Sequence, residues 1–228
     1  TAAPTCSPTR ASMLTGINSL ANGVIRPYAN PRTESYGMPL YHKILPEYLL
    51  EAGYQTALSG KWHLGMSSDE YLPSSRGFQQ TYGHMNGGID YYDHSFSGRL
   101  DWHRDNIPLV EDGYATNLIA NEAIRIIKNK DKNKPLFLYV AFNAPHTPIQ
   151  VENDVMNELL FIEDIDDRRY AANIYSLDRE IGKIIDVIEN ENLLENTIIL
   201  FFSDNGPVFD VDPIAATIAP GLLDAKGN

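Results

Sequence analysis

Cysteine is almost absent from this sequence, since Cys6 is the only one among 228 residues. A single cysteine excludes a disulfide within the chain, so cysteine usage indicates no redox compartment. Long apolar runs are missing as well, because no stretch approaches the roughly 20 apolar residues that a membrane-spanning helix needs. The sequence therefore predicts neither a disulfide-stabilised fold nor a membrane span.

Positive charge is scarce too. The chain has 18 Lys and Arg residues against 30 Asp and Glu residues, which leaves a formal net charge of −12. A chain with this balance does not attract nucleic acid or an anionic surface through its overall field. If its substrate is anionic, the positive charge has to be concentrated in one pocket.

Three signals at the level of processing are also missing: an Asn-x-Ser/Thr glycosylation acceptor, a starting methionine and a signal peptide. The first absence favours a bacterial protein over a glycosylated animal lysosomal or secreted enzyme. The other two say little about compartment, because the chain opens on Thr1 in the middle of a motif. We expect a piece of a longer protein.

The residues that are present alternate between helical and strand patterns. Amphipathic or capped segments predict helices over 44–52, 115–129 and 167–190, in addition to one after Cys6. Short apolar runs predict strands over 54–59, 135–142 and 197–202. Residues 17–39 and 66–113 are expected to be loops. This alternation predicts an α/β fold, with a mostly parallel central sheet and helices on both faces.

Polar motifs follow three of the predicted strands: Lys61/His63, His146 and Asp204/Asn205. In open α/β sheets, ligands bind beyond the carboxyl ends of the strands. We therefore expect these side chains to meet at one edge of the sheet. Each also has a structural interpretation, namely a solvated lysine with a core histidine, a loop histidine bonded to its own turn, and an Asn-Gly turn.

The cysteine lies in the segment Cys6-Ser7-Pro8-Thr9-Arg10, which Leu-Thr-Gly closes at Gly16. Ser7 is a candidate N-cap and Pro8 a candidate first helical residue. Cys6 would then precede a helix N-terminus, where free N–H groups favour an anion, and Arg10 could point back toward it. From the residues alone, Cys6 is either a buried free thiol or a nucleophilic thiolate.

Cys-x-Pro-x-Arg with its Leu-Thr-Gly close resembles the signature of the sulfatase family. Gly60-Lys61-Trp62-His63-Leu64-Gly65 and Ala144-Pro145-His146-Thr147-Pro148 resemble two further motifs of that family, in the same order. Segments 60–66, 72–73, 76–78, 90–94 and 134–139 are similar to its arylsulfatase B (N-acetylgalactosamine-4-sulfatase) group. The resemblance implies an alkaline-phosphatase-like fold, with residues 1–228 as one catalytic-domain fragment that lacks the first strand and the C-terminal part.

The resemblance also implies a mechanism. A formylglycine-generating enzyme would oxidise Cys6 to Cα-formylglycine, whose hydrate attacks the sulfur of a sulfate monoester and then expels sulfate through its second hydroxyl. Arg10 would orient this group, Lys61 or His146 would bind sulfate and protonate the leaving alcohol, and His63 would take up a proton.

The family's calcium site is implied only in part. Asp204 and Asn205 would supply hard oxygen ligands for Ca²⁺. The resemblance places two aspartates of that site on the strand before Cys6, and a second active-site lysine after Asn205 that Lys226 does not match. Both lie outside the printed chain, so we expect the calcium site here to be incomplete.

The expected substrate is a sulfated carbohydrate or an aryl sulfate. Tyr92 and His94, within the long loop, either stack on a sugar or pack in the interior. The resemblance implies a periplasmic or secreted bacterial protein, or a lysosomal or extracellular animal one. Two alternatives stay open: a phosphate or phosphonate ester hydrolase of the same superfamily, and a non-catalytic protein with unmodified Cys6.

Overall fold

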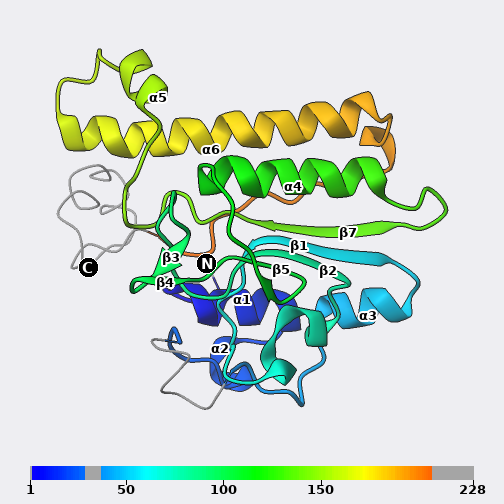
Figure 1. Cartoon of the computed structure of the whole chain (residues 1–228). Helices are drawn as coiled ribbons and strands as arrows, with labels where there is room; N and C mark the ends of the chain where they lie inside the picture. Colours follow the sequence, from blue (N-terminus) through cyan, green and yellow to red (C-terminus); the bar gives the residue numbers. More distant parts are fainter. Residues whose placement is uncertain (1, 29–36, 207–228) are drawn as a thin grey trace.

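A computed structural model describes residues 2–28 and 37–206 of the chain (Figure 1). The α-helices are α1 (Cys6–Thr15), α2 (Ser19–Asn22), α3 (Leu45–Glu51), α4 (Ala115–Asn129), α5 (Asn153–Glu158) and α6 (Ile165–Asn190). The strands are β1 (Gln55–Lys61), β2 (Gln80–His84), β3 (Ser95–Phe96), β4 (Arg99–Leu100), β5 (His103–Arg104), β6 (Ile107–Pro108) and β7 (Leu136–Ala141). Three short 3₁₀ helices are η1 (Asp69–Tyr71), η2 (Pro73–Arg76) and η3 (Leu194–Asn196).

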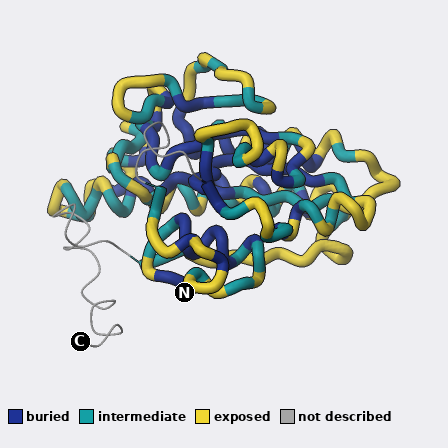
Figure 2. The backbone as a smooth tube through the Cα atoms, turned by 90° about the horizontal axis from the view of Figure 1, so that it is seen from below, coloured by how far each residue is buried: buried dark blue, intermediate teal, exposed yellow. Residues whose placement is uncertain are grey.

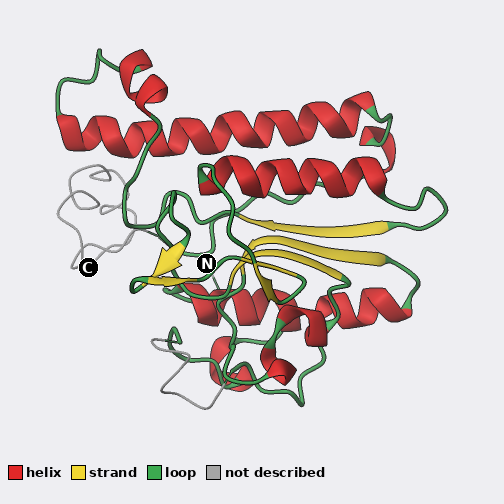
Figure 3. Cartoon of the chain, viewed as in Figure 1, coloured by secondary structure: helices red, strands yellow, loops and turns green. Residues whose placement is uncertain are grey.

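One five-stranded sheet organises the chain, with the order β6-β5-β2-β1-β7. Strands β2, β1 and β7 run parallel, whereas β5 and β6 extend the sheet antiparallel. Helices α4 and α6 cover one face, and α1, α2 and α3 lie on the other (Figures 1 and 3). The predicted α/β architecture is confirmed, with the antiparallel strands as an addition that makes the sheet mixed.

The register brings the carboxyl ends of the parallel strands level with one another. Lys61 at the end of β1 pairs with His84 at the end of β2, and Gly60 pairs with Ala141 at the end of β7. Residues that follow these strands therefore start from one edge of the sheet, which is the arrangement that positions the candidate site.

Two buried clusters fix the helices to the sheet. Below it, Leu14 of α1 and Leu58 of β1 pack with Trp62 and Phe78. Above it, Ile119 of α4 packs in a cluster that contains Trp102. Figure 2 shows the buried parts of the tube gathered in the centre of the view, with exposed segments around them. Within residues 2–28 and 37–206, no helix is both long and apolar enough to cross a membrane.

The sequence predictions for the long loops were partly wrong. Residues 66–113 contain β2, β5, β6 and the separate β3–β4 hairpin, and residues 17–39 contain α2. Strand β2 escaped prediction because its sequence, Gln-Thr-Tyr-Gly-His, has no apolar run. It is nonetheless buried from Thr81 to His84, because strand β1 flanks it and the cluster around Trp102 covers it.

Residues 197–202 do not form the predicted buried strand. Their backbone has no strand assignment, and Ile198, Leu200 and Phe201 are 90%, 78% and 79% exposed. An apolar run becomes a buried strand only when another strand pairs with it, and no strand among the described residues does so. The run is apolar enough for a buried strand, but such a strand needs a partner strand beside it, and the described part of the chain supplies none.

The ends and faces of two helices also differ from expectation. Helix α1 starts at Cys6 with Thr5 as its N-cap, so Cys6 is the first helical residue and Ser7 is not the cap. In α6, the spacing of Ile174, Leu177, Ile181, Ile184 and Ile188 by three and four residues predicts one buried stripe. Ile184 and Ile188 are buried, but Ile174 is 40% exposed. Polar residues take three of the other buried positions in α6: Asn173, Ser176 and Glu180.

Candidate active site

The start of α1 is fixed to the end of β1 by Ser7. Its Oγ donates a hydrogen bond to the carbonyl oxygen of His63 at 2.8 Å and accepts one from the N–H of Tyr28 at 3.3 Å. Cys6, one residue earlier, is half-buried. The only cysteine of the chain therefore lies at a helix N-terminus, beside the segment that carries Lys61 and His63.

Arg10 is held by three separate elements. Its Nη1 donates to the carbonyl oxygen of Lys61 at 2.9 Å and to the hydroxyl of Tyr139 at 3.0 Å. Its Nε and Nη2 lie 3.1 and 3.0 Å from Oδ2 of Asp204. A guanidinium bound on both edges is fixed in orientation, and Arg10 thereby joins α1, β1, β7 and the segment after residue 202.

Lys61 is 2% exposed and lies among the other charged groups of the site. Burial lowers its pKa to about 8, and the charge of Arg10 acts in the same direction, while Cys6 and Asp204 oppose the shift. Lys61 is therefore a cation at neutral pH whose proton is easier to remove than that of an ordinary lysine.

His63 faces the same cluster from the loop that follows β1. Its Nε2 lies 3.1 Å from the carbonyl oxygen of Tyr28, which can only accept, so Nε2 carries the hydrogen and Nδ1 is the basic nitrogen. Burial first, and then the charge of Lys61, lower the pKa of His63 well below 6.5. A neutral ring with a free Nδ1 is suited to take up a proton.

His146 lies nearer to solvent than the other members of the cluster. Its Nδ1 lies 2.8 Å from the carbonyl oxygen of Thr147, so Nδ1 carries the hydrogen and Nε2 is left for a ligand. Protein packed along the ring removes part of its hydration and, together with the charge of Lys61, lowers the pKa of His146. Its electrostatic partners also include Asp204 and Arg10, which places it at the same site.

Asp204 and Asn205 lie at the edge of this cluster. Asp204 binds Arg10 through Oδ2 and accepts the N–H of Asn205 through Oδ1 at 2.9 Å, while the Asn205 side chain donates to the carbonyl oxygen of Gly206. Among residues 2–28 and 37–206, no group of three His, Cys, Asp or Glu side chains could hold a metal ion. Calcium takes six to eight oxygen ligands, so the residues present supply only part of a site.

The structure places the two predicted sugar-contacting residues outside the cluster. His94 is 1% exposed, stacks on Trp102 with ring centroids 4.6 Å apart, and lies 3.0 Å from the carbonyl oxygen of Gly113. Tyr92 is 45% exposed and donates to the carbonyl oxygen of Val151. His94 therefore packs in the interior, whereas nearly half of the Tyr92 surface is open to solvent.

Sequence reasoning missed two polar residues, the half-buried Tyr139 on β7 and the buried Asn143 just after it. Tyr139 holds Arg10, and Asn143 is 4% exposed with no hydrogen-bond partner for its amide atoms in the described chain. The period-2 alternation of β7 could have indicated that Tyr139 faces α1. Nothing in the sequence around Asn143 distinguishes it from a turn residue before Pro145.

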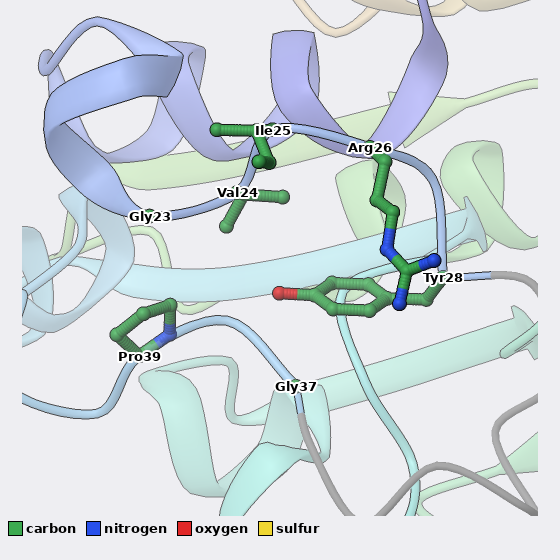
Figure 4. A pocket seen from close by; sticks show the side chains of 7 residues that line it. All are labelled: Gly23, Val24, Ile25, Arg26, Tyr28, Gly37 and Pro39. Carbon is green, nitrogen blue, oxygen red and sulfur yellow. The ribbon is translucent and has the colours of Figure 1, made fainter.

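A pocket of about 290 Å³ adjoins the site. It is lined by Gly23, Val24, Ile25, Arg26, Tyr28, Gly37 and Pro39. Figure 4 shows the Tyr28 ring lying across it, with the Arg26 guanidinium beside that ring. Because the Tyr28 backbone also contacts Ser7 and His63, the pocket and the charged cluster share one wall.

Taken together, the geometry defines a class of protein. The α/β sheet presents a half-buried cysteine at a helix N-terminus, with three cationic or basic side chains from β1 and the loops after it and after β7. Such a cluster supplies the concentrated positive charge that an anionic ester needs, in a chain of net charge −12. The described chain is therefore an α/β protein with an anion-binding cluster at the carboxyl edge of its sheet.

Comparison with known proteins gives the family. The sulfatase family model matches residues 1–222, so the chain belongs to the sulfatase family. Mouse arylsulfatase J is 34% identical over 211 residues, which cover 89% of this chain and 35% of that protein. Human N-acetylgalactosamine-6-sulfatase is 31% identical over 221 residues, which cover 89% of this chain and 41% of that protein.

A solved structure gives the same picture. The crystal structure of Ps i-CgsB in complex with k-i-k-neocarrahexaose matches with a TM-score of 0.81 at 31% identity, over 90% of this chain and 49% of that chain. The chain thus spans less than half the length of these relatives, with 35% and 41% for the two curated ones.

Proposed function

We propose that this chain carries the catalytic centre of a sulfatase that hydrolyses sulfate monoesters on a sulfated glycan. The observation that carries the proposal is the meeting of Cys6, Arg10, Lys61, His63 and His146 at one sheet edge, in a chain whose family match covers residues 1–222. The arylsulfatase B group and the exact glycan stay predictions.

Cys6 is the proposed site of modification. Formylglycine at this position would supply the oxygen that attacks sulfur and a second oxygen that releases the sulfate. The position fits such a group, because the helix N-terminus and the Lys61 ammonium both stabilise negative charge beside residue 6. Arg10, fixed on both edges, holds the end of β1 and Asp204 in place next to α1.

The proposed roles of the remaining residues follow how deeply each side chain is buried. Lys61, almost fully buried, binds a sulfuryl oxygen and offsets charge that develops in the transition state. His63, neutral and with a basic Nδ1, takes up a proton at the residue 6 side. His146 is exposed, so the alcohol part of the substrate, which extends outward, meets its Nε2; the bound anion raises the pKa of His146 and prepares it to donate a proton.

Calcium has only a partial fit. Asp204 and Asn205 offer oxygen ligands at the edge of the cluster, and we propose that the other ligands come from residues outside the described part of the chain. No step above depends on the ion. The formylglycine-generating enzyme as a partner and export to the periplasm or cell exterior are proposals that follow from the same modification.

The test starts with the mass of the Cys6 peptide, after the protein carrying this sequence is expressed together with a formylglycine-generating enzyme. Conversion lowers the mass by about 18 Da, since the thiol becomes an aldehyde. The converted protein is then assayed with an aryl sulfate, the matching aryl phosphate and sulfated oligosaccharides. Faster hydrolysis of sulfate supports the proposal. Preference for phosphate favours the phosphohydrolase alternative, and an unmodified Cys6 favours the non-catalytic one.

A further inference from the structure

The turn that follows β2 contacts both candidate catalytic histidines. A Cβ atom built on Gly87 would lie 2.5 Å from Cε1 of His63, and one built on Gly88 would lie 3.3 Å from the ring of His146. Two adjacent residues without side chains thus touch two rings that approach from different elements, after β1 and after β7.

This turn is fixed to the sheet rather than resting on it. Asp101 is 3% exposed, and both of its carboxylate oxygens accept hydrogen bonds from the turn. Oδ1 accepts the N–H of Met85 at 3.2 Å, while Oδ2 accepts the N–H and the side-chain amide of Asn86 at 2.9 and 2.7 Å. The backbone before the two glycines is therefore held by a buried carboxylate.

The turn is also bonded directly to the chain that carries His63. The N–H of Trp62 donates to the carbonyl oxygen of His84 at 2.9 Å, and the N–H of His63 donates to that of Met85 at 3.1 Å. On the other side, the hydroxyl of Tyr91 donates to the carbonyl oxygen of His146 at 2.8 Å. Backbone positions next to both histidines are thus tied to the segment that contains the two glycines.

We propose that Gly87 and Gly88 are positioning residues, which form a spacer that sets where the His63 and His146 rings stand relative to each other. The proposal rests on the proposed function, in which these rings move protons on opposite sides of the sulfate. Neither glycine has a φ in the left-handed region, so the absence of a side chain, and not an unusual backbone, is the property that the position requires.

The two positions predict different effects of one added methyl group. In Gly88→Ala the new atom meets His146 and the Thr147 carbonyl at 3.2–3.3 Å, so the ring shifts by a few tenths of an ångström. In Gly87→Ala the contact of 2.5 Å forces a larger shift of His63. Gly182→Ala in α6 is the matched control, because nothing lies within 4 Å of its added Cβ.

The experiment measures kcat and KM of the formylglycine-containing protein with aryl sulfates whose leaving groups span a range of acidity. A displaced His146 donates its proton to the leaving alcohol less effectively. Gly88→Ala should therefore lower kcat about tenfold for the least acidic leaving group and less than twofold for the most acidic. Gly87→Ala should lose activity on all of them, and Gly182→Ala on none. A Gly88→Ala loss that is equal for all leaving groups, or absent, overturns the proposal.

A second measurement, histidine NMR, tests the role of Gly87 and Gly88 independently of whether the protein is a sulfatase. Side-chain NMR of the histidine rings should show shifts confined to His146 in Gly88→Ala and to His63 in Gly87→Ala, whether or not the protein hydrolyses sulfate. An inactive wild type with these shifts contradicts the function but supports the spacer. An active wild type whose histidine signals are the same in all three variants contradicts the spacer alone. If Gly87→Ala does not fold, the milder Gly88→Ala decides.

Discussion

Arg10 shows how one side chain can connect the site to the fold. It is buried, and its donors are shared among Lys61, Tyr139 and Asp204. A lysine reaches one or two of these partners but cannot reproduce the two-edged geometry of a guanidinium. The residue is therefore expected to matter for both stability and catalysis.

We expect Arg10→Lys to lower the free energy of unfolding by about 1–3 kcal/mol, because buried acceptors lose their donors. It should also lower kcat by more than tenfold. Urea denaturation and steady-state kinetics measure the two effects. The matched control is Arg169→Lys, since the Arg169–Asp166 pair is about half exposed on both sides and should change either quantity little. Equal results for the two variants would contradict the interpretation of Arg10.

His84 is the second residue with a measurable consequence. It is 1% exposed, stacks parallel to Trp102 at 6.3 Å, and neither ring nitrogen has a hydrogen-bond partner in the described chain. Burial, and then the charge of Lys61, keep the pKa of His84 well below 6.5. The native state therefore holds a neutral ring at a pH where the unfolded chain binds a proton.

This difference predicts a loss of stability in acid. Below pH 6.5 the unfolded state binds one more proton at His84 than the native state, so the free energy of unfolding falls by up to about 1.4 kcal/mol per pH unit from this group. In His84→Phe this contribution disappears, although His63 and His146 keep theirs. Denaturation at pH 7.5, 6.5 and 5.5 should give a shallower acid slope than the wild type. An unchanged slope would mean that His84 is protonated in the native state.

At the residue scale the sequence predicted which side chains come together. Lys61, His63 and His146 meet because each lies at or just after the end of a parallel strand, and these strand ends lie level; their catalytic roles stay predictions. Tyr92 and His94 could not be assigned, since an aromatic residue in a loop binds a sugar or packs inside with the same sequence pattern. The stacking of His94 on Trp102, which decides its place, is a contact between separate segments.

Among the elements, α1, α3, α4, α6, β1 and β7 were predictable, whereas α2, α5 and β2 were not, and the apolar run 197–202 does not form the strand that it predicted. Helix α4 buries Ile119, Ala123 and Ile127 as its spacing indicates. Strand β2 is defined by its neighbours β1 and β5 and by its turn, whose contacts with Asp101 span 15 or 16 residues. Pairing and buried hydrogen bonds between distant segments leave no local signal.

The turn after β2 gives a prediction at the scale of an element. Asp101→Asn replaces one acceptor oxygen by an NH₂ group that faces the donors of Met85 and Asn86. We expect a loss of about 2–4 kcal/mol in the free energy of unfolding, because buried donors lose their acceptor. Asp186→Asn, on the exposed face of α6, should stay within about 0.5 kcal/mol. Thermal and urea unfolding of both variants measure the difference; similar values would show that the carboxylate does not hold the turn.

The distribution of charge over the whole chain reconciles a net charge of −12 with the anionic substrate that we propose. Arg10 and Lys61 are buried at one edge of the sheet, where low dielectric strengthens their effect, while Asp and Glu residues lie mainly on the outside. The negative charge of the whole chain repels polyanions, while the buried cations at the site attract one anionic group. Composition indicated this division, but only the packing of α1 against β1 and β7 shows how it is built.

Two features of the molecule lead to the last prediction. The apolar residues 197–202 are exposed, and the oxygen ligands at Asp204 and Asn205 form only part of a calcium site. A strand that pairs with residues 197–202 and ends in aspartates would cover the exposed run and complete the calcium site.

We therefore expect residues 1–228 alone to show no measurable Ca²⁺ affinity in calorimetry, and a longer form of the protein that contains such a strand to bind. At a Ca²⁺ concentration of about 100 times Kd, binding should raise the free energy of unfolding by about 2.7 kcal/mol, and Asp204→Asn should reduce both effects. Tight binding by residues 1–228 alone would show that this chain supplies all the oxygen ligands that the ion needs, and a longer chain that does not bind would remove Asp204 and Asn205 as ligands.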